Sequence, residues 1–286
     1  MNIILGATGQ VGSAVVDNLI EKGLPVKAVI RNEEKAHELK SKGAEVAIAD
    51  YFDLDALKEA VKDGDLIFLL TPENGTSDDV LGDTEKLLDN YHKAIGQSNI
   101  KSLIGLSSIG AQHAKGTGNL VMSNMLENKF SDLNINNVFI RPAYYYSNWL
   151  MSLDMVEESG ILPSFYPTDL EFNMISPNDV AKFVADKIEN GIDQSEVIEI
   201  VGPTKYSTND IAKVMSKTLD KEVNTHEIPR TEWSEIMKSI GFTDDATKNF
   251  VEMTEFVVSG KAEPEGKKQS PISTNTTFEE YLNQFV

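Results

Sequence analysis

The sequence has no cysteine among its 286 residues. Disulfide bonds, thiolate metal sites, cysteine nucleophiles and thiol redox switches are therefore excluded. Positive charge is scarce as well, because 26 Lys and Arg stand against 45 Asp and Glu and the formal net charge is −19. Such a surface repels phosphate backbones and anionic lipid headgroups, so we expect neither direct nucleic-acid binding nor membrane docking.

Long apolar runs are also missing. No stretch approaches the ~18 apolar residues of a membrane span. The opening MNIILGATG lacks the basic region and the cleavage site of a signal peptide, so we interpret it as a β-strand and expect a cytoplasmic protein. The four histidines show no metal-ligand spacing, and we expect no metal site.

Strand-like apolar runs alternate with helix-like segments through the first half of the chain. The patterns predict strands over 2–5, 26–30, 46–49, 66–70, 102–106 and 138–140, and helices over 11–21, 33–42, 54–62, 77–97 and 120–132. Runs that are apolar on both faces and separated by helices indicate a parallel sheet covered on both sides. We therefore predict an α/β fold with a Rossmann-type, doubly wound parallel sheet.

After Pro142 the alternation becomes less regular. The patterns predict helices over 180–188, 209–219, 231–241, 245–258 and 278–285, a strand over 197–201, an extended segment over 222–228 and a polar surface loop over 259–277. We predict a dinucleotide-binding core over 1–142, to which residues 175–202 return. Residues 143–286 are predicted to form a smaller, mixed α/β substrate-binding cap with C-terminal helices.

The segment Gly6-Ala7-Thr8-Gly9-Gln10-Val11-Gly12 joins the first predicted strand to the first predicted helix. Gly6 permits a tight turn, Gly9 lets a diphosphate approach the main chain, and Gly12 lets the helix pack on the strand. Unpaired N–H groups at the helix N-terminus attract the phosphates. The alternative is a glycine-rich turn that binds nothing. The strand–loop–helix context favours a dinucleotide site built from Gly6, Thr8, Gly9, Gln10, Val11 and Gly12.

Arg31 follows the second predicted strand, where NAD-binding proteins usually carry Asp or Glu. A guanidinium pairs with a 2′-phosphate that a carboxylate would repel, so the sequence favours NADP(H) over NAD(H). Lys35, one helical turn further on, is a weaker candidate for the same contact. A solvated surface cation is the alternative for both residues.

Taken together, these motifs resemble the NmrA-like family of atypical short-chain dehydrogenase/reductase proteins. The resemblance rests on the GATGQVG loop, Arg31, Ala49-Asp50-Tyr51, Arg141-Pro142, Gly202-Pro203 with Thr208-Asn209-Asp210, and the closing Thr277-Phe278-Glu279-Glu280-Tyr281. It covers nearly the whole chain. Within the family, the chain looks similar to the NADPH-dependent quinone-reductase-like members.

The resemblance implies further contacts with the cofactor. Asp50 would meet the adenine amine with Tyr51 nearby, Leu70, Thr71 and Pro72 would line the middle of the pocket, Ser107 and Ser108 would lie near the nicotinamide ribose, and Pro142, Ala143 and Tyr144 would flank the nicotinamide ring. These positions agree with the rule that ligands bind outside the carboxyl ends of parallel strands. A helix cap is the alternative for Asp50, and a plain turn is the alternative for the two serines.

Ordinary short-chain reductases carry a Tyr-x-x-x-Lys pair on the helix after the fifth strand, and this chain lacks it. Our alignment puts Leu120 at the tyrosine position and Asn124 at the lysine position. Asn124 can hydrogen-bond a ribose or an amide, but it is no proton donor at neutral pH. The catalytic residues therefore stay unassigned, with Tyr144 and Asn124 as candidates.

Aromatic residues after Pro142 suggest a site for a flat acceptor. Tyr144, Tyr145, Tyr146, Asn148 and Trp149 would form one wall, and Phe165, Tyr166, Phe172 and Met174 the opposite one, with core packing as the alternative for each. We favour an NADPH-dependent oxidoreductase that passes hydride to a small planar acceptor such as a quinone. The alternative is a non-catalytic NADP(H)-responsive redox sensor acting through a protein partner. The sequence leaves open a homo-oligomer or a regulatory partner.

Overall fold

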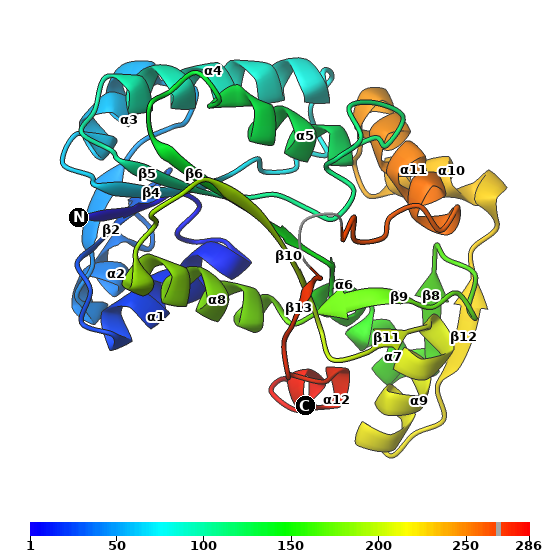
Figure 1. Cartoon of the computed structure of the whole chain (residues 1–286). Helices are drawn as coiled ribbons and strands as arrows, with labels where there is room; N and C mark the ends of the chain where they lie inside the picture. The colour runs from blue at the N-terminus through cyan, green and yellow to red at the C-terminus, as the bar shows by residue number, and fades with distance from the viewer. Residues whose placement is uncertain (267–269) are drawn as a thin grey trace.

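Eight parallel strands form the central sheet of the computed structural model, which describes residues 1–266 and 270–286 (Figure 1). Their order is β13 (Ile272–Ser273), β10 (Glu196–Val201), β6 (Asn136–Pro142), β5 (Ser102–Leu106), β4 (Leu66–Leu70), β1 (Asn2–Ile4), β2 (Val26–Ile30) and β3 (Glu45–Ile48). Every adjacent pair is parallel. The chain runs outward from β1 in one direction and from β4 in the other. The strand order therefore reverses between these two strands, where doubly wound folds bind ligands.

Helices cover both faces of the sheet, as Figure 1 shows. One face carries α1 (Gln10–Glu21), α2 (Ala36–Lys42) and α8 (Pro177–Asn190), and the other carries α3 (Leu54–Val61), α4 (Val80–Gly96) and α5 (Leu120–Lys129). Two separate apolar clusters fill the spaces, one around Val15 and Val184 and the other around Leu57, Leu88 and Leu126. The predicted Rossmann-type, doubly wound sheet is confirmed.

A smaller region follows β6 and has an apolar core of its own. Its strands are β7 (Tyr144–Tyr145), β9 (Phe172–Ile175) and β11 (Lys205–Tyr206) in one small sheet, and β8 (Ile161–Ser164) paired with β12 (Asn224–Glu227). Its helices are α6 (Ser147–Leu150), α7 (Leu153–Ser159), α9 (Thr208–Thr218), η1 (Arg230–Glu232), α10 (Trp233–Ser239), α11 (Asp244–Val258) and α12 (Phe278–Leu282). Tyr146, Ile211, Met215 and Phe278 lie in its core. The proposed division at residue 142 stays a prediction, although α8 and β10 do lie in the layers of the large sheet.

Local capping explains where the structure departs from the predicted helix bounds. The helix expected from residue 33 starts at Ala36, because the Asn32 side chain accepts a hydrogen bond from the Glu34 N–H in a turn instead of capping a helix. The helix expected from residue 77 starts after Asp79, whose carboxylate accepts from the Gly82 N–H. The helix expected to residue 132 ends at Lys129, and the helix expected to residue 285 ends at Leu282.

Short elements were the hardest to predict. The segments that form α6, α7, β8 and β9 carry no clear periodicity, and the sequence did not predict them. The expected surface loop over 259–277 is wrong at Ile272–Ser273, which pairs with Ile200–Val201 as the outermost strand of the sheet. Part of that predicted loop, residues 267–269, lies outside the described residues. None of the helices described in the structure is both long and apolar enough to cross a membrane.

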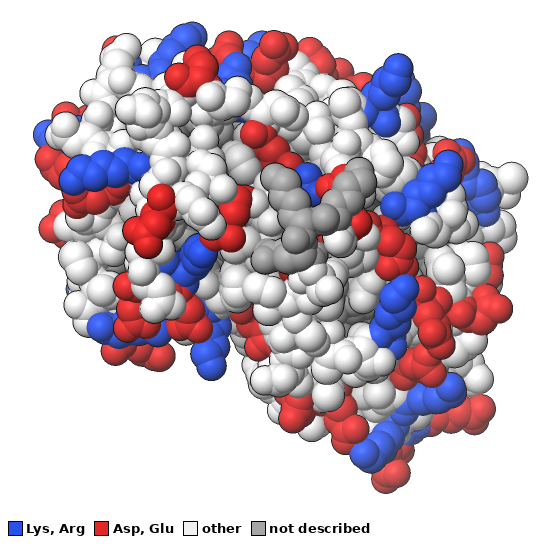
Figure 2. Space-filling view, in the orientation of Figure 1, with Lys and Arg blue, Asp and Glu red and all other residues white. Residues whose placement is uncertain are grey.

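Charged side chains of both signs lie on the face that Figure 2 shows, with acidic side chains in several parts of it. On this face the acidic residues are therefore not confined to a single site.

Candidate functional site

The glycine loop connects β1 to α1 at the carboxyl edge of the sheet. Gly6 has a φ of +66°, in the left-handed region that favours glycine, and the Gly9 N–H donates to the Gly6 carbonyl oxygen at 2.9 Å. A Cβ on Gly12 would lie 2.2 Å from that same oxygen, so the first turn of α1 packs too closely for any side chain. Both glycines therefore have the geometry that the dinucleotide motif requires.

The N-terminus of α1 lacks a capping side chain. Among the described residues no side chain bonds to its first N–H groups, its N-cap is Gly9, and its first turn holds no acidic residue. By contrast, Asp53 caps α3 and Ser176 caps α8. The free N–H groups and the positive end of the helix dipole are suited to an anion, and the exposed N-cap Gly9 has no side chain to cover them. This cradle fits the diphosphate of a dinucleotide.

The other residues predicted in the loop divide into two kinds. Thr8, Gly9 and Gln10 are exposed at the edge, whereas Val11 is buried in the apolar core beneath α1. Only the main chain of Val11 is therefore available to a ligand. Contacts of these residues with a cofactor stay predictions.

Tyr51 supports the glycine loop from β3. Its hydroxyl accepts a hydrogen bond from the Gly6 N–H at 2.5 Å, and its buried ring makes an edge contact with Tyr91 at 5.6 Å between ring centres. The Asn90 amide donates to the Tyr51 carbonyl oxygen at 3.0 Å. Burial raises the pKa of Tyr51, so its hydroxyl stays neutral. The sequence predicted Tyr51 near the adenine and did not predict this role in shaping the loop.

Arg31 is exposed at the end of β2 and forms no ion pair within the part of the chain that the structure describes. The positive charge of Arg31 has a lowering effect on the pKa of Tyr51, the residue whose hydroxyl bonds to the glycine loop. Asp50 is exposed nearby, and its carboxylate accepts from the Phe52 N–H at 2.9 Å. Asp53, rather than Asp50, caps α3. The predicted adenine contact of Asp50 and the predicted phosphate contact of Arg31 remain untested.

The end of β4 lies beside the glycine loop. A Cβ on Gly6 would come within 2.7 Å of the Leu70 side chain, and the Tyr91 hydroxyl donates to the Leu70 carbonyl oxygen at 3.3 Å. Thr71 is partly buried and Pro72 is exposed. All three residues lie at the carboxyl edge, as predicted, next to the point where the strand order reverses.

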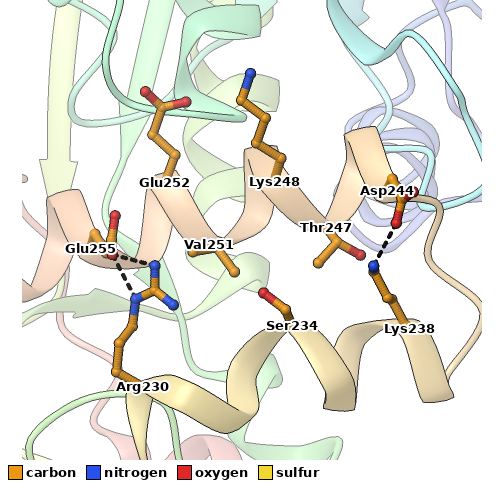
Figure 3. Close-up of a pocket in the computed structure, with 9 residues that line it drawn as sticks. All are labelled: Arg230, Ser234, Lys238, Asp244, Thr247, Lys248, Val251, Glu252 and Glu255. Carbon is orange, nitrogen blue, oxygen red and sulfur yellow. Dashed lines mark hydrogen bonds and ion pairs between the residues drawn. The ribbon is translucent and has the colours of Figure 1, made fainter.

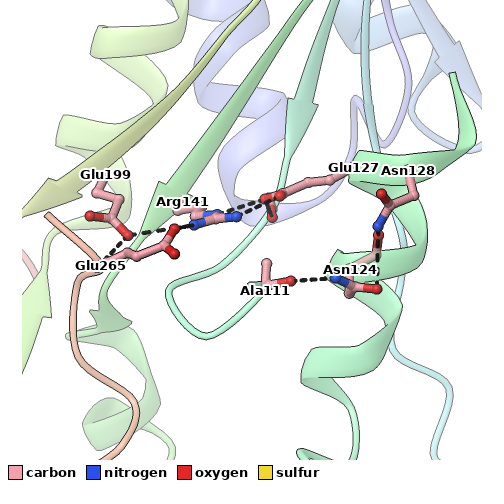
Figure 4. A network of polar contacts seen from close by, with 8 residues as sticks. Ala111, Asn124, Glu127, Asn128, Arg141, Glu199 and Glu265 are labelled. Carbon is pink, nitrogen blue, oxygen red and sulfur yellow. Dashed lines mark hydrogen bonds and ion pairs between the residues drawn. The ribbon is translucent and has the colours of Figure 1, made fainter. Parts of the chain in front are cut away.

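Several side chains predicted to lie near the nicotinamide ribose form hydrogen bonds within the protein (Figure 4). The Ser107 hydroxyl donates to Glu127 at 2.5 Å, and the Asn124 amide donates to the Ala111 carbonyl oxygen at 2.7 Å. The Ser108 hydroxyl donates to the carbonyl oxygen of Ile109 at 3.0 Å. Ser107 and Asn124 therefore stabilise the loop between β5 and α5. Their contacts with a cofactor stay predictions.

A buried arginine links several strand ends (Figure 4). Arg141 is only 7% exposed and bonds to Glu127 at 2.7 Å, with Glu265 at 3.3 Å and Glu199 at 3.6 Å. Glu199 also accepts from the N–H groups of Glu265 at 2.8 Å and Gly266 at 2.9 Å. Burial alone lowers the pKa of Arg141, but hydrogen bonds to Glu127 and Glu265 raise it overall, so the guanidinium stays charged. With Pro142 buried beside it, the sequence motif Arg141-Pro142 is an anchor for β6.

Aromatic side chains gather beyond the end of β6. Tyr144 makes edge contacts with Trp149 at 5.9 Å, Tyr166 at 5.7 Å and Phe172 at 5.4 Å. Burial raises the pKa of its hydroxyl to about 12. The rings pack on one another, so they form one cluster and not the two facing walls that the sequence suggested.

Other residues of those predicted walls belong to the core. Tyr146 is fully buried against Phe278 and Tyr281. Met174 is fully buried and accepts from the Trp149 indole N–H, and Phe165 packs in a separate cluster with Trp233 and Phe250. For these residues core packing, the alternative interpretation, is correct.

Gln10 connects the glycine loop to the C-terminal region. The Ser147 hydroxyl donates to the Gln10 side-chain oxygen at 3.0 Å, and the Gln10 amide donates to the Tyr281 hydroxyl at 3.4 Å. These partners lie on α6 and α12, far from Gln10 in the sequence. The Gln10 side chain joins the loop to the smaller region, and the contact of Gln10 with a cofactor stays a prediction.

The hollow between α10 and α11, of about 430 Å³, is separate from this site (Figure 3). Two of its cations are paired, Arg230 with Glu255 and Lys238 with Asp244, both at 2.5 Å. None of the predicted cofactor residues lines it. Among the described residues, no group of three or more His, Asp or Glu side chains gathers to hold a metal ion.

Comparisons with known proteins agree with this arrangement. The model of the NmrA-like family matches residues 2–282. Quinone oxidoreductase 2 of Escherichia coli is 25% identical over 250 residues, which cover 85% of this chain and 83% of that protein. An NAD(P)H azoreductase of Xenophilus azovorans is 23% identical over 248 residues, covering 85% and 82%.

Two solved structures share the fold. An NADPH-dependent quinone oxidoreductase of Escherichia coli, complexed with NADPH, superposes with a TM-score of 0.82 at 23% identity over 99% of each chain. The Citrobacter sp. triphenylmethane reductase, complexed with NADP(H), gives a TM-score of 0.82 at 21% identity over 100% of this chain and 99% of the other. At these identities the likeness establishes the fold.

Proposed function

Because the chain belongs to the NmrA-like family, we propose that it is an NADPH-dependent oxidoreductase that passes hydride to a small planar acceptor such as a quinone. The observation that carries the proposal is the uncapped N-terminus of α1 beside the Gly6–Gly12 contact. A backbone site of this kind is suited to a diphosphate and has no evident structural use without one. The relatives that are named as quinone and azo reductases support the same class of reaction.

The choice of NADP(H) rests on Arg31. An exposed guanidinium with no carboxylate partner among the described residues is available for a 2′-phosphate. When bound, NADPH would supply the hydride. Main-chain N–H groups of the glycine loop would hold the diphosphate, and Tyr51 would keep the loop in shape through the Gly6 N–H.

The choice of a planar acceptor rests on the aromatic cluster around Tyr144. Tyr144 is the partly exposed member of this cluster, and the buried Trp149 and Phe172 hold its ring in place. A rigid ring of this kind stacks on flat conjugated molecules at little conformational cost. Quinones and azo compounds, which the names of the relatives indicate as acceptors, are flat and conjugated. A hydride acceptor of this shape needs mainly to be positioned over the reactive ring.

Steady-state oxidation of NADPH and NADH with a panel of quinones and azo dyes tests the proposal. We expect turnover with at least one acceptor and a preference for NADPH. Binding of both oxidised and reduced cofactor without any turnover would refute the enzyme and favour the redox sensor. A calorimetric titration that detects no cofactor binding would refute the cofactor site itself.

A further inference from the structure

Tyr51 carries a hydroxyl group that uses only part of its hydrogen-bonding capacity within the protein. The side chain is 7% exposed, and its oxygen accepts the Gly6 N–H at 2.5 Å. A phenol also has one proton to donate. Within the part of the chain that the structure describes, this O–H donates to no protein acceptor. A buried donor without a partner costs free energy, so the Tyr51 O–H is suited to a group that a ligand brings.

The Tyr51 ring is held in place by neighbours that have partners of their own. Its edge contact with the Tyr91 ring has a centre-to-centre distance of 5.6 Å, and the Tyr91 hydroxyl donates to the Leu70 carbonyl oxygen at 3.3 Å. The Asn90 amide donates to the Tyr51 carbonyl oxygen at 3.0 Å. The ring and the main chain of Tyr51 are therefore both fixed, and its hydroxyl stays at the start of the glycine loop.

This hydroxyl lies at the carboxyl edge of the sheet, beside the diphosphate cradle. Its partner Gly6 is partly exposed and begins the loop that leads to the free N–H groups of α1. A Cβ on Gly6 would come within 2.7 Å of the Leu70 side chain, and Leu70 is partly exposed too. These residues end β1 and β4, between which the strand order reverses. Negatively charged diphosphate oxygens are strong acceptors for a donor at this place.

The bond from Gly6 makes the phenol a better donor. Hydrogen bonds in series polarise one another, so an oxygen that accepts from an N–H donates its own proton more strongly. Burial raises the pKa of Tyr51, so the hydroxyl keeps that proton at neutral pH. The Gly6 N–H itself is directed at Tyr51 and is not free for a ligand.

We propose that the Tyr51 hydroxyl donates a hydrogen bond to a diphosphate oxygen of the bound dinucleotide, so that the Gly6 N–H acts on the ligand through the phenol. The inference rests on the proposed function, because it requires the dinucleotide site. It adds one side-chain donor to a cradle that is otherwise made of main chain. That donor follows β3 and lies 45 residues from Gly6 in the sequence.

The first test removes the hydroxyl and keeps the ring. In calorimetric titrations with NADP⁺, Tyr51→Phe should raise the dissociation constant at least about tenfold, because a hydrogen bond to a charged oxygen is lost. Tyr91→Phe is the matched control, since it removes a neighbouring buried hydroxyl that donates to a carbonyl oxygen of the protein, and it should stay within about twofold of the wild type. Thermal unfolding without cofactor reports whether each variant is folded. Equal losses in the two variants would contradict the proposal.

The second test separates donation to the ligand from support of the loop. Replacing Tyr51 with 3-fluorotyrosine makes the phenol a stronger donor and a weaker acceptor and keeps every group in place. A hydroxyl that donates to the diphosphate should then bind NADP⁺ more tightly, by roughly twofold. A hydroxyl that serves only as acceptor for the Gly6 N–H should bind it less tightly. The same replacement at Tyr91 should leave the affinity unchanged.

Neither test depends on turnover. If the wild type binds neither NADP⁺ nor NADPH, the proposed function fails and this inference with it. If the wild type binds them but Tyr51→Phe keeps the wild-type affinity, or if the fluorinated phenol weakens binding, only the inference fails.

Discussion

The two ends of the candidate site are built in different ways. At the glycine loop, the main chain of one short segment, residues 6–12, makes the cradle. At the aromatic cluster around Tyr144, side chains from β7, from α6, and from β9 with the segment before it come together. A main-chain site depends on where side chains are absent, whereas the cluster depends on which side chains meet. The first can therefore be recognised from a motif and the second cannot.

The largest expected effect concerns the ion-pair network around Arg141, and it tests how much stability that network loses without its one arginine. Arg141→Met leaves Glu127, Glu199 and Glu265 close together without their buried cation. We expect a loss of about 3–5 kcal/mol in the free energy of unfolding, measured by urea denaturation. The matched control is Arg230→Met, which removes an ion pair whose two side chains are each 51% exposed and should cost less than about 1 kcal/mol. Equal losses in the two variants would show that the network does not anchor β6.

The next effect tests the main-chain site. Gly12→Ala places a Cβ 2.2 Å from the Gly6 carbonyl oxygen, so the loop and the first turn of α1 must separate. We expect NADPH affinity to fall by roughly a hundredfold or more, since overpacking costs about 1–3 kcal/mol and the cradle also loses its shape. Calorimetry measures the affinity, and circular dichroism reports the fold. Gly96→Ala, where the added Cβ meets Leu133 at an ordinary 3.4 Å, should change neither.

Arg31→Asp tests the one side chain on which the cofactor preference depends. It replaces a guanidinium with a carboxylate that repels a 2′-phosphate, so the ratio of NADPH to NADH dissociation constants should shift at least about tenfold towards NADH. Lys40→Asp makes the same charge change at another exposed position and should leave the ratio unchanged. A ratio that does not move in Arg31→Asp would remove the argument for NADP(H).

The smallest expected effect concerns the contact between the glycine loop and α12. Tyr281→Phe removes the hydroxyl that accepts from the Gln10 amide at 3.4 Å. A neutral bond of this length contributes about 0.5 kcal/mol, so NADPH affinity should fall about twofold. In a Gln10→Ala background the same substitution should have no effect. A loss that persists there would mean that Tyr281 acts on the cofactor site by another route.

Local sequence patterns predicted much of the large sheet. Leu66–Leu70 is apolar on both faces, Val26–Ile30 is apolar except for Lys27, and the two segments form β4 and β2 with those bounds. The glycine loop has the geometry that its motif requires. The two-residue strand at Ile272–Ser273 was not predicted, because its conformation depends on Ile200 and Val201, some seventy residues away in the chain.

The candidate acceptor site was predicted less well. Tyr144 was recognised as a candidate, but Tyr146 and Met174 proved to be core residues. The hydroxyl of Ser107 is engaged by Glu127, a residue one α5 turn beyond Asn124 that no motif marks.

By itself, the sequence determined the parallel sheet, the diphosphate cradle and the cation at the end of β2, because each depends on periodicity or on neighbours within a few residues. Tertiary structure alone decided which polar groups meet beside the strand ends. Tyr51 contacts Gly6, and Tyr144 contacts Tyr166 and Phe172, only because packing brings distant segments together. Hydrophobic periodicity specifies which face of an element is buried, but it carries no information about the partner that will cover that face.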